Sequence, residues 1–566
     1  MKTVDSIYRT KAQWQKRYTL PEIGTNEELK KIPAKRPYVT CQNGTFVGNV
    51  EDDVNVWKGI PFAEQPVGKL RFAKAQEPKR SNKIFDATYF GKSCLQSWDE
   101  HELASQYAQG EDCLCLNVWS NAKNKNKKKP VLVYIHGGGW ISGGSSDPLY
   151  DGFNFAHYNP DVIVVTITYR FGFMGLINLS SFKDSKAYST SVSNATLDQI
   201  QALRWINKNI KYFGGNPKNV TICGESAGGG SVSILCTIKE ARKYFCKAIP
   251  MSGGCNQLNT IEQSKVLPNA IRNPEVAVEG KTPAIRNAIS VSDLQKVPFE
   301  QLANWWNKNY SVIHNLVVGD GKVVPKDPYK QWRNGNISDI TVMQGHTSNE
   351  FEYYLCLFGF NEPFFDTLCK VCSEMVAKSG NRKYKKAYEE YIKQVKKLGY
   401  TTEQELNREY MDDYSLCSGN IYQAYTHSKC GGKEFCYVFD KSYDGELERI
   451  GAAHAVDCFY LFGNFDGKCA YGDKDEVELS RKFQKMIAAF CATGDPSIEN
   501  LKWKPYNIKK GYQMIINDKT HLEKGYQLAK TKAIIKMVES NAKYRYILNF
   551  ADLIPATQKA MEEQQK

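Results

Sequence analysis

The chain has 566 residues, of which 42% are apolar, 12% aromatic and 24% charged. A chain of this composition can bury a sizeable core, which excludes collagenous, disordered and mini-protein classes. The net charge of +14 favours solubility but is too dilute for a nucleic-acid-binding domain, so we expect no nucleic-acid partner. No apolar run approaches the roughly 18 residues of a membrane span, so we expect a soluble protein without a transmembrane segment.

The cysteines and the first residues bear on the cellular compartment. Seventeen cysteines are an odd number for a disulfide scaffold, and several lie in apolar contexts where a thiol packs as a small hydrophobe. Residues 1–20 are charged and lack the apolar core of a secretory signal. We therefore expect a cytoplasmic protein, although a secreted protein whose leader has been removed would also fit the sequence.

The chain divides into an N-terminal extension and one main body. Residues 1–37 are polar and contain three prolines, which predicts an extension. We expect residues 38–566 to form a single domain, because strand and helix patterns alternate along them. Residues 350–430 are mostly helical in pattern and predict helical insertions over the active-site edge of the sheet.

Short β-branched runs mark the expected strands of the main body. Several runs are continuously apolar, as in parallel strands that are covered on both faces, and amphipathic helices at 197–210 and 480–492 lie between them. The pattern predicts an α/β fold with a mostly parallel central sheet flanked by helices. The lysine-rich segment 123–129 predicts a solvated hairpin loop between the first two strands. The expected strands are residues 116–119, 131–135, 162–169, 220–223, 248–251, 340–344, 435–439 and 513–516.

A Gly-Glu-Ser-Ala-Gly sequence occupies residues 224–228, between the strand 220–223 and a helix of small residues. The motif alone is weak evidence. A strand–turn–helix arrangement around it, however, is typical of the nucleophile elbow, which pushes a serine hydroxyl above the carboxyl edge of a sheet. The context predicts Ser226 as a nucleophile; the alternative is a glycine-rich turn with an incidental serine.

A second glycine-rich segment, His-Gly-Gly-Gly-Trp at 136–140, follows the strand 131–135. Acyl transfer develops negative charge on a carbonyl oxygen, and backbone N–H donors must already point toward it. We expect Gly138, Gly139 and Ala227 to supply these donors as an oxyanion hole. A phosphate-binding loop is the alternative, but no P-loop lysine follows.

The serine needs a general base, and the base needs an orienting carboxylate. In the fold that carries this elbow, the order along the chain is nucleophile, acid, histidine. His454 is the preferred base among the downstream histidines. Glu350 follows the expected strand 340–344 and is the preferred acid, with Glu352 and Asp320 as rivals.

Residues 213–228 resemble the active-site signature of the type-B carboxylesterases and cholinesterases, and residues 111–119 resemble a second signature of that family. Further motifs follow in the family's order at 58–63, 70–72, 197–199, 319–321 and 503–506, so the resemblance covers approximately residues 38–510. It implies the α/β-hydrolase fold and hydrolysis of carboxylic esters. It also selects Glu350 and His454, the latter within a His-x-x-acidic pattern that Asp457 completes.

The same resemblance implies three structural pairs. Two are ion pairs, and the third is a disulfide that secreted members of the family form. The pairs are Arg71 with Glu111, Arg170 with Asp198, and Cys94 with Cys113.

We therefore expect a serine hydrolase that cleaves carboxylic esters through an acyl-enzyme intermediate, without a metal or organic cofactor. The alternatives are another acyl hydrolase, such as a lipase, thioesterase or amidase, and a non-catalytic cholinesterase-like binding protein. The intact triad and oxyanion loop argue against the binding protein.

The expected partner is a small-molecule ester, and the sequence leaves its identity and the oligomeric state open. Aromatic residues between 351 and 365 are more typical of packing, but any that face the cleft would favour hydrophobic acyl or aromatic groups. Trp98 lies in the loop where cholinesterases carry a choline-binding aromatic, but the loop is short, so a cholinesterase is not supported. Glu225 could favour a cationic group, stabilise a protonated histidine or serve only in structure.

Overall fold

The structure of the chain, a computed structural model, describes residues 27–96, 108–122, 128–272, 285, 287–309, 316–352, 361–441, 451–465, 472–541, 547–548 and 550–564. Trp98, the lysines at 123–127 and the aromatic residues at 353–360 lie outside these ranges. Within the described ranges, none of the helices combines the length and the hydropathy needed to cross a membrane.

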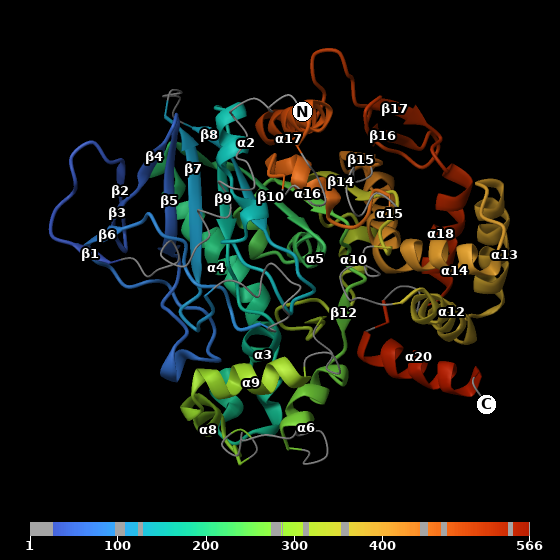
Figure 1. Ribbon diagram of the computed structural model, residues 1–566, viewed down its shortest axis with the longest axis horizontal. Helices are drawn as coiled ribbons and strands as arrows, with labels where there is room; N and C mark the ends of the chain where they lie inside the picture. Colours follow the sequence, from blue (N-terminus) through green and yellow to red (C-terminus); the bar gives the residue numbers. More distant parts are fainter. Residues whose placement is uncertain are drawn as a thin grey trace.

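An eleven-stranded sheet forms the centre of the molecule, in the order β17-β16-β15-β14-β11-β10-β8-β9-β7-β5-β4 (Figure 1). The strands from β9 through β16 are parallel, and antiparallel pairs lie only toward the two edges. This arrangement confirms the expected mostly parallel sheet. The strands are β4 (Asn49–Glu51), β5 (Val54–Pro61), β7 (Cys115–Asn121), β8 (Lys129–Ile135), β9 (Ile163–Ile167), β10 (Gly215–Glu225), β11 (Lys247–Met251), β14 (Thr341–Thr347), β15 (Glu434–Phe439), β16 (Tyr512–Ile516) and β17 (His521–Lys524).

The two faces of the sheet contribute to different hydrophobic cores, because successive side chains of a strand point in opposite directions. Val131 and Val133 of β8 pack in a core with side chains of α4 (Asn194–Asn209) and α5 (Ala227–Leu235). Leu132 and Tyr134 pack in a second core with side chains of α16 (Val456–Phe462) and α17 (Lys474–Thr493). Continuous apolar strands are thus explained by helices on both faces.

The expected hairpin between the first two strands is wrong. β9 lies between β7 and β8, antiparallel to the first and parallel to the second. Lys129, at the end of the lysine-rich segment, is buried and donates a hydrogen bond from Nζ to the carbonyl of Asn121 at 2.9 Å. The apolar strand β9 (163–167) needs a neighbouring strand on each side. It therefore lies between β7 and β8, although these two strands are consecutive in the sequence.

Helices gather at the end of the molecule that lies opposite a small sheet of β1, β6, β3 and β2 (Figure 1). These helices are α12 (Glu362–Lys378), α13 (Arg382–Lys397), α14 (Glu403–Asp412), a π-helix (Asp413–Cys417), α15 (Ser418–Lys429), α18 (Leu528–Ser540) and α20 (Phe550–Gln564). The remaining α-helices are α2 (Phe153–Tyr158), α3 (Gly172–Gly175), α6 (Val266–Arg272), α8 (Val291–Lys296), α9 (Phe299–Asn309) and α10 (Tyr329–Arg333). The short strands are β1 (Glu28–Leu29), β2 (Tyr38–Cys41), β3 (Gly44–Val47), β6 (Ile84–Asp86), β12 (Leu258–Asn259) and β13 (Val317–Val318).

The division into an extension and a single domain stays a prediction. Only the last part of the expected extension is described, and β1 within it pairs with β6 of the main body through Glu28 and Phe85.

Candidate active site

Ser226 lies at the turn between β10 and α5. Its backbone has φ 58° and ψ −122°, a strained conformation for a residue with a side chain, and its N–H donates to the carbonyl of Met251 at 3.0 Å. A Cβ at Gly228 would collide with the carbonyl oxygen of Ile135, so the close approach of α5 to β8 requires glycine. The turn therefore holds the half-buried Ser226 at the carboxyl end of β10, as the elbow motif predicts.

The structure brings His454 and Glu350 together from segments that are 104 residues apart. Glu350 follows β14, and His454 lies two residues before the start of α16. Their side chains are buried, and Nδ1 of His454 lies 2.5 Å from Oε2 of Glu350. The imidazole is therefore fixed with its other nitrogen, Nε2, directed away from Glu350.

The second oxygen of Glu350 is also hydrogen-bonded. Oε1 accepts a hydrogen bond from Ser252 Oγ at 2.5 Å and one from the N–H of Thr347 at 2.8 Å. Burial acts to raise the pKa of Glu350, but His454 and the Ser252 hydroxyl outweigh it and hold the pKa below its usual value. Glu350 is thus an ionised acceptor that is oriented on both oxygens.

His454 lies between two carboxyl groups. Its Nε2 atom is 3.0 Å from Oε1 of Glu225, the residue immediately before Ser226, so the imidazole borders the elbow. Burial acts to lower the pKa of His454, but the charges of Glu225 and Glu350 raise it to about 9. Burial itself raises the pKa of Glu225 to about 8 and that of Asp457 to about 7. A cluster of acids around one histidine favours its protonated form.

The two rival acids have other partners. Glu352 forms an ion pair with Arg408 at 3.2 Å, and Asp320 accepts a hydrogen bond from Ser193 Oγ at 3.0 Å. These contacts leave Glu350 as the candidate that faces His454.

A second buried histidine–glutamate pair was not expected from the sequence. Nδ1 of His427 lies 2.7 Å from Oε2 of Glu434, and both side chains are fully buried. Glu434 begins β15, so this pair lies at the amino edge of the parallel strands, whereas Ser226 lies at their carboxyl edge. The pair is therefore separate from the candidate catalytic group.

The expected oxyanion loop has the backbone that its glycines permit. Gly138 and Gly139 have φ values of +96° and +58°, and Ala227 is the first residue of α5, so its N–H has no acceptor within that helix. A Cβ at Gly137 would lie 3.2 Å from Cβ of Ser226, which places this loop beside the elbow. The three expected N–H donors are thus carried by two segments that meet at Ser226.

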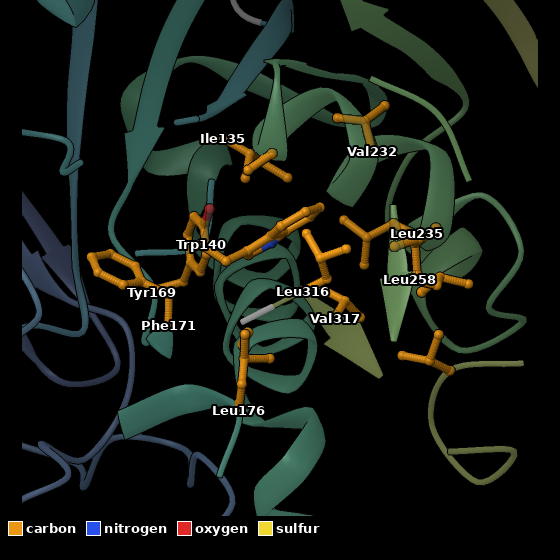
Figure 2. Close-up of a cluster of buried hydrophobic side chains, with 14 of the residues drawn as sticks. Ile135, Trp140, Tyr169, Phe171, Leu176, Val232, Leu235, Leu258, Leu316 and Val317 are labelled. Carbon is orange, nitrogen blue, oxygen red and sulfur yellow. The ribbon is translucent and has the colours of Figure 1, made fainter. Parts of the chain in front are cut away.

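Trp140 anchors the glycine-rich loop in the core. Figure 2 shows its indole among Ile135, Val232 and Leu316, and the ring nitrogen donates to Ser231 Oγ at 3.2 Å. A large buried ring directly after the glycines fixes a loop whose own residues have no side chains with which to pack.

His346, Glu350 and Cys417 are the group within the described ranges whose ligand atoms lie close enough, within 4.8 Å, to hold a metal ion. Both oxygens of Glu350 already accept hydrogen bonds, one of them from His454. We therefore assign Glu350 to the histidine and assign no metal to this group.

Two of the three pairs that the resemblance implies are present as close ion pairs. Arg71 contacts Glu111 at 2.5 Å, and Arg170 contacts Asp198 at 2.7 Å with both side chains buried. Cys94 and Cys113 are both buried free thiols. Cys94 forms a side-chain hydrogen bond with Cys113 that raises the pKa of the Cys113 thiol. The disulfide between them stays a prediction.

A nucleophile elbow, a glycine-rich loop beside it and a buried His–Glu pair at the carboxyl edge of a mostly parallel sheet define an α/β-hydrolase with the site of a serine hydrolase. The carboxylesterase family model matches residues 35–534, so the chain belongs to the carboxylesterase family.

Curated relatives and solved structures agree with this membership. The chain is 32% identical over 491 residues to the para-nitrobenzyl esterase of Bacillus subtilis, covering 86% of this chain and 96% of the relative. It is 30% identical over 511 residues to the acetylcholinesterase of Bungarus fasciatus, covering 85% and 82%. The carboxylesterase structure from Geobacillus stearothermophilus matches with a TM-score of 0.74 at 28% identity, covering 87% of this chain and 99% of that one. The protein is a serine hydrolase of carboxylic esters, and its substrate is a small-molecule ester.

Proposed function

We propose that Ser226, His454 and Glu350 are the catalytic triad of this esterase, and that the N–H groups of Gly138, Gly139 and Ala227 form its oxyanion hole. The observation that carries this proposal is the 2.5 Å contact between His454 Nδ1 and Glu350 Oε2, beside the turn that holds Ser226. A histidine oriented on one nitrogen by a carboxylate leaves the other nitrogen to accept a proton.

In the first step, Ser226 Oγ attacks the ester carbonyl carbon while His454 Nε2 takes the hydroxyl proton. The carbonyl oxygen becomes an oxyanion, which the three backbone N–H groups stabilise. The tetrahedral intermediate then collapses: the bond to the alcohol oxygen breaks, and His454 returns its proton to the leaving alcohol. The product of this step is an ester of Ser226 with the acyl group.

Water completes the cycle by the same groups. His454 accepts a proton from water as the water oxygen attacks the acyl carbon, and a second oxyanion forms in the same place. When this intermediate collapses, the bond to Ser226 Oγ breaks, His454 protonates Oγ, and the carboxylic acid leaves. Glu350 keeps its charge throughout and stabilises the imidazolium form of His454.

We further propose that the preferred esters carry a hydrophobic acyl or an aromatic group. The support is the relative at 32% identity that is named for a para-nitrobenzyl ester. The aromatic segment after Glu350 adds little, since Phe351 is buried and stacks on Phe365 with ring centroids 5.4 Å apart. A series of esters that varies acyl length and leaving group separately tests this preference; equal kcat/KM values across the series would reject it.

The cytoplasmic location is also a proposal. It is supported by buried cysteines that pack as thiols, such as Cys223 in β10 and Cys491 in α17. Fractionation of cells that produce the protein tests it, and recovery of the esterase in the medium would reject it.

Replacement of the proposed nucleophile tests the catalytic assignment. The Ser226→Ala variant should keep the fold and lose at least ~10³-fold in ester turnover, because no acyl-enzyme can form. Circular dichroism and thermal unfolding check the fold. Near-normal hydrolysis by a folded variant would refute the nucleophile.

A further inference from the structure

The orientation of α13 is fixed by its buried face. Tyr384, Ala387, Tyr391 and Val395 are buried, and α13 packs against α18. The Tyr391 hydroxyl donates to Asp413 at 2.8 Å. Since these contacts hold one side of the helix against the protein, its other side is held toward solvent.

The exposed side of α13 is strongly basic. The helix carries seven basic and two acidic side chains, a net charge of +5 on sixteen residues. In the described part of the chain, none of the seven cations has a carboxylate within ion-pair distance, and Glu390 accepts a hydrogen bond from Gln394. The exposed basic residues, which we call the α13 basic face, are Arg382, Lys383, Lys385, Lys386, Lys393, Lys396 and Lys397.

Part of this face forms a stripe along one side of the helix, in which the exposed acid Glu389 lies between Lys386 and Lys393. Residues 382, 386, 393 and 397 are separated by four, seven and four positions, a spacing that places them along one side of a helix. A helix of this length spans about 24 Å. The stripe is therefore a straight row of exposed charged side chains, with two cations on each side of one acid.

Exposed apolar side chains follow the basic face. Leu398 and Tyr400, just after the C-terminal end of α13, are 43% and 36% exposed. Figure 1 shows α13 at the periphery of the helical end of the molecule. The neighbouring α18 adds two exposed lysines, Lys532 and Lys536. Basic side chains combined with exposed apolar ones suit the interface of a bilayer, where cations meet headgroups and apolar groups enter the acyl boundary.

We propose that the α13 basic face docks the esterase on an anionic lipid bilayer. A peripheral helix presents a row of cations to a flat surface, whereas a nucleic acid would call for a groove with interleaved aromatic side chains. Esters with apolar groups partition into bilayers, so docking there raises the local concentration of substrate for a carboxylesterase. The contact is peripheral and electrostatic, and it requires no membrane-spanning segment.

Flotation of the full-length chain with lipid vesicles tests the proposal. The protein should bind vesicles that contain phosphatidylserine, bind phosphatidylcholine vesicles much less, and be released as the salt concentration rises. A variant with Lys386→Glu, Lys393→Glu and Lys397→Glu should lose at least about tenfold in partitioning onto phosphatidylserine vesicles. Its unfolding midpoint and its turnover of a water-soluble ester should not change, because these side chains are exposed.

A matched variant tests whether vesicle binding depends on the position of the charges or only on the net charge of the protein. Lys218→Glu, Lys502→Glu and Lys509→Glu make the same charge change at exposed positions outside α13, so vesicle binding should stay within about twofold of the wild type. Equal losses in the two variants would overturn the proposal. So would failure of the wild type to float with anionic vesicles, including the case in which it binds heparin or RNA instead.

Discussion

The Nε2 atom of His454 lies 3.0 Å from Oε1 of Glu225, while Nδ1 of the same ring lies 2.5 Å from Oε2 of Glu350. The imidazole is thus bracketed by two carboxyl groups, one of them on the residue next to Ser226. Each carboxylate stabilises the imidazolium and acts to raise the pKa of His454.

The Glu225→Gln substitution should move the acid limb of the pH–rate profile to lower pH. His454 must be neutral to accept the serine proton, so kcat/KM rises with pH through its pKa. Glutamine removes a charge that raises this pKa, so the neutral form persists to lower pH. The plateau should also fall, by about tenfold, because the transition-state imidazolium loses a carboxylate.

The Asp457→Asn variant should shift the acid limb in the same direction as Glu225→Gln, but by less. Asp457 is a smaller contributor to the raised pKa of His454, so its removal should shift the limb less. An unchanged profile for Glu225→Gln, or a larger shift for Asp457→Asn, would contradict the account. Measurements of kcat/KM across the pH range on one ester decide between these outcomes.

The Ser252→Ala substitution should lower activity through Glu350. The lost hydroxyl donates to Glu350 Oε1 at 2.5 Å, so the carboxylate loses one of the groups that orient it and hold its pKa low. We expect kcat to fall about tenfold, with little change in KM. The free energy of unfolding should fall by about 1–3 kcal/mol.

Ser191→Ala is the control for Ser252→Ala. Ser191 is also buried and donates one hydrogen bond, to the carbonyl of Ile177 at 2.8 Å. Its loss should lower stability by a similar amount while kcat is unchanged. Equal effects of both substitutions on kcat would mean that Ser252 acts through stability alone.

The Arg170→Met substitution should strongly destabilise the fold. Arg170 and Asp198 form a fully buried pair at 2.7 Å, and methionine leaves the Asp198 carboxylate without its counter-charge. The expected loss is about 3–5 kcal/mol in the free energy of urea unfolding. The double variant Arg170→Met with Asp198→Leu should recover most of it. A double variant as unstable as the single one would show that packing, not charge, sets the cost.

Much of the fold follows from local patterns in the sequence. The continuous apolar runs in β8, β10 and β11 identify central parallel strands because helices cover both faces. The elbow around Ser226 can be recognised from the sequence because part of its steric requirement is local: a Cβ at Gly224 would lie 2.6 Å from the backbone of Gly228. Such features depend on nearest neighbours along the chain.

Features that depend on distant segments were missed. The position of β9 between β7 and β8 follows from burial of the whole sheet, which a pattern within one strand does not encode. Ser252 meets Glu350 across the fold, 98 residues away. The pair of His427 and Glu434 is local, only 7 residues apart between α15 and β15, but was missed as well. The sequence signal for Ser252 was a polar residue directly after a buried strand. The signal for Glu434 was an acidic residue at the start of a buried strand.

The most direct test of the central claim is to locate the covalent bond. The protein is treated with a fluorophosphonate that mimics the tetrahedral intermediate, digested and mapped by mass spectrometry. The account predicts one adduct per chain, on the peptide that contains Ser226, with loss of ester turnover in proportion to labelling. An adduct on another residue that abolishes turnover while Ser226 stays unmodified would contradict it.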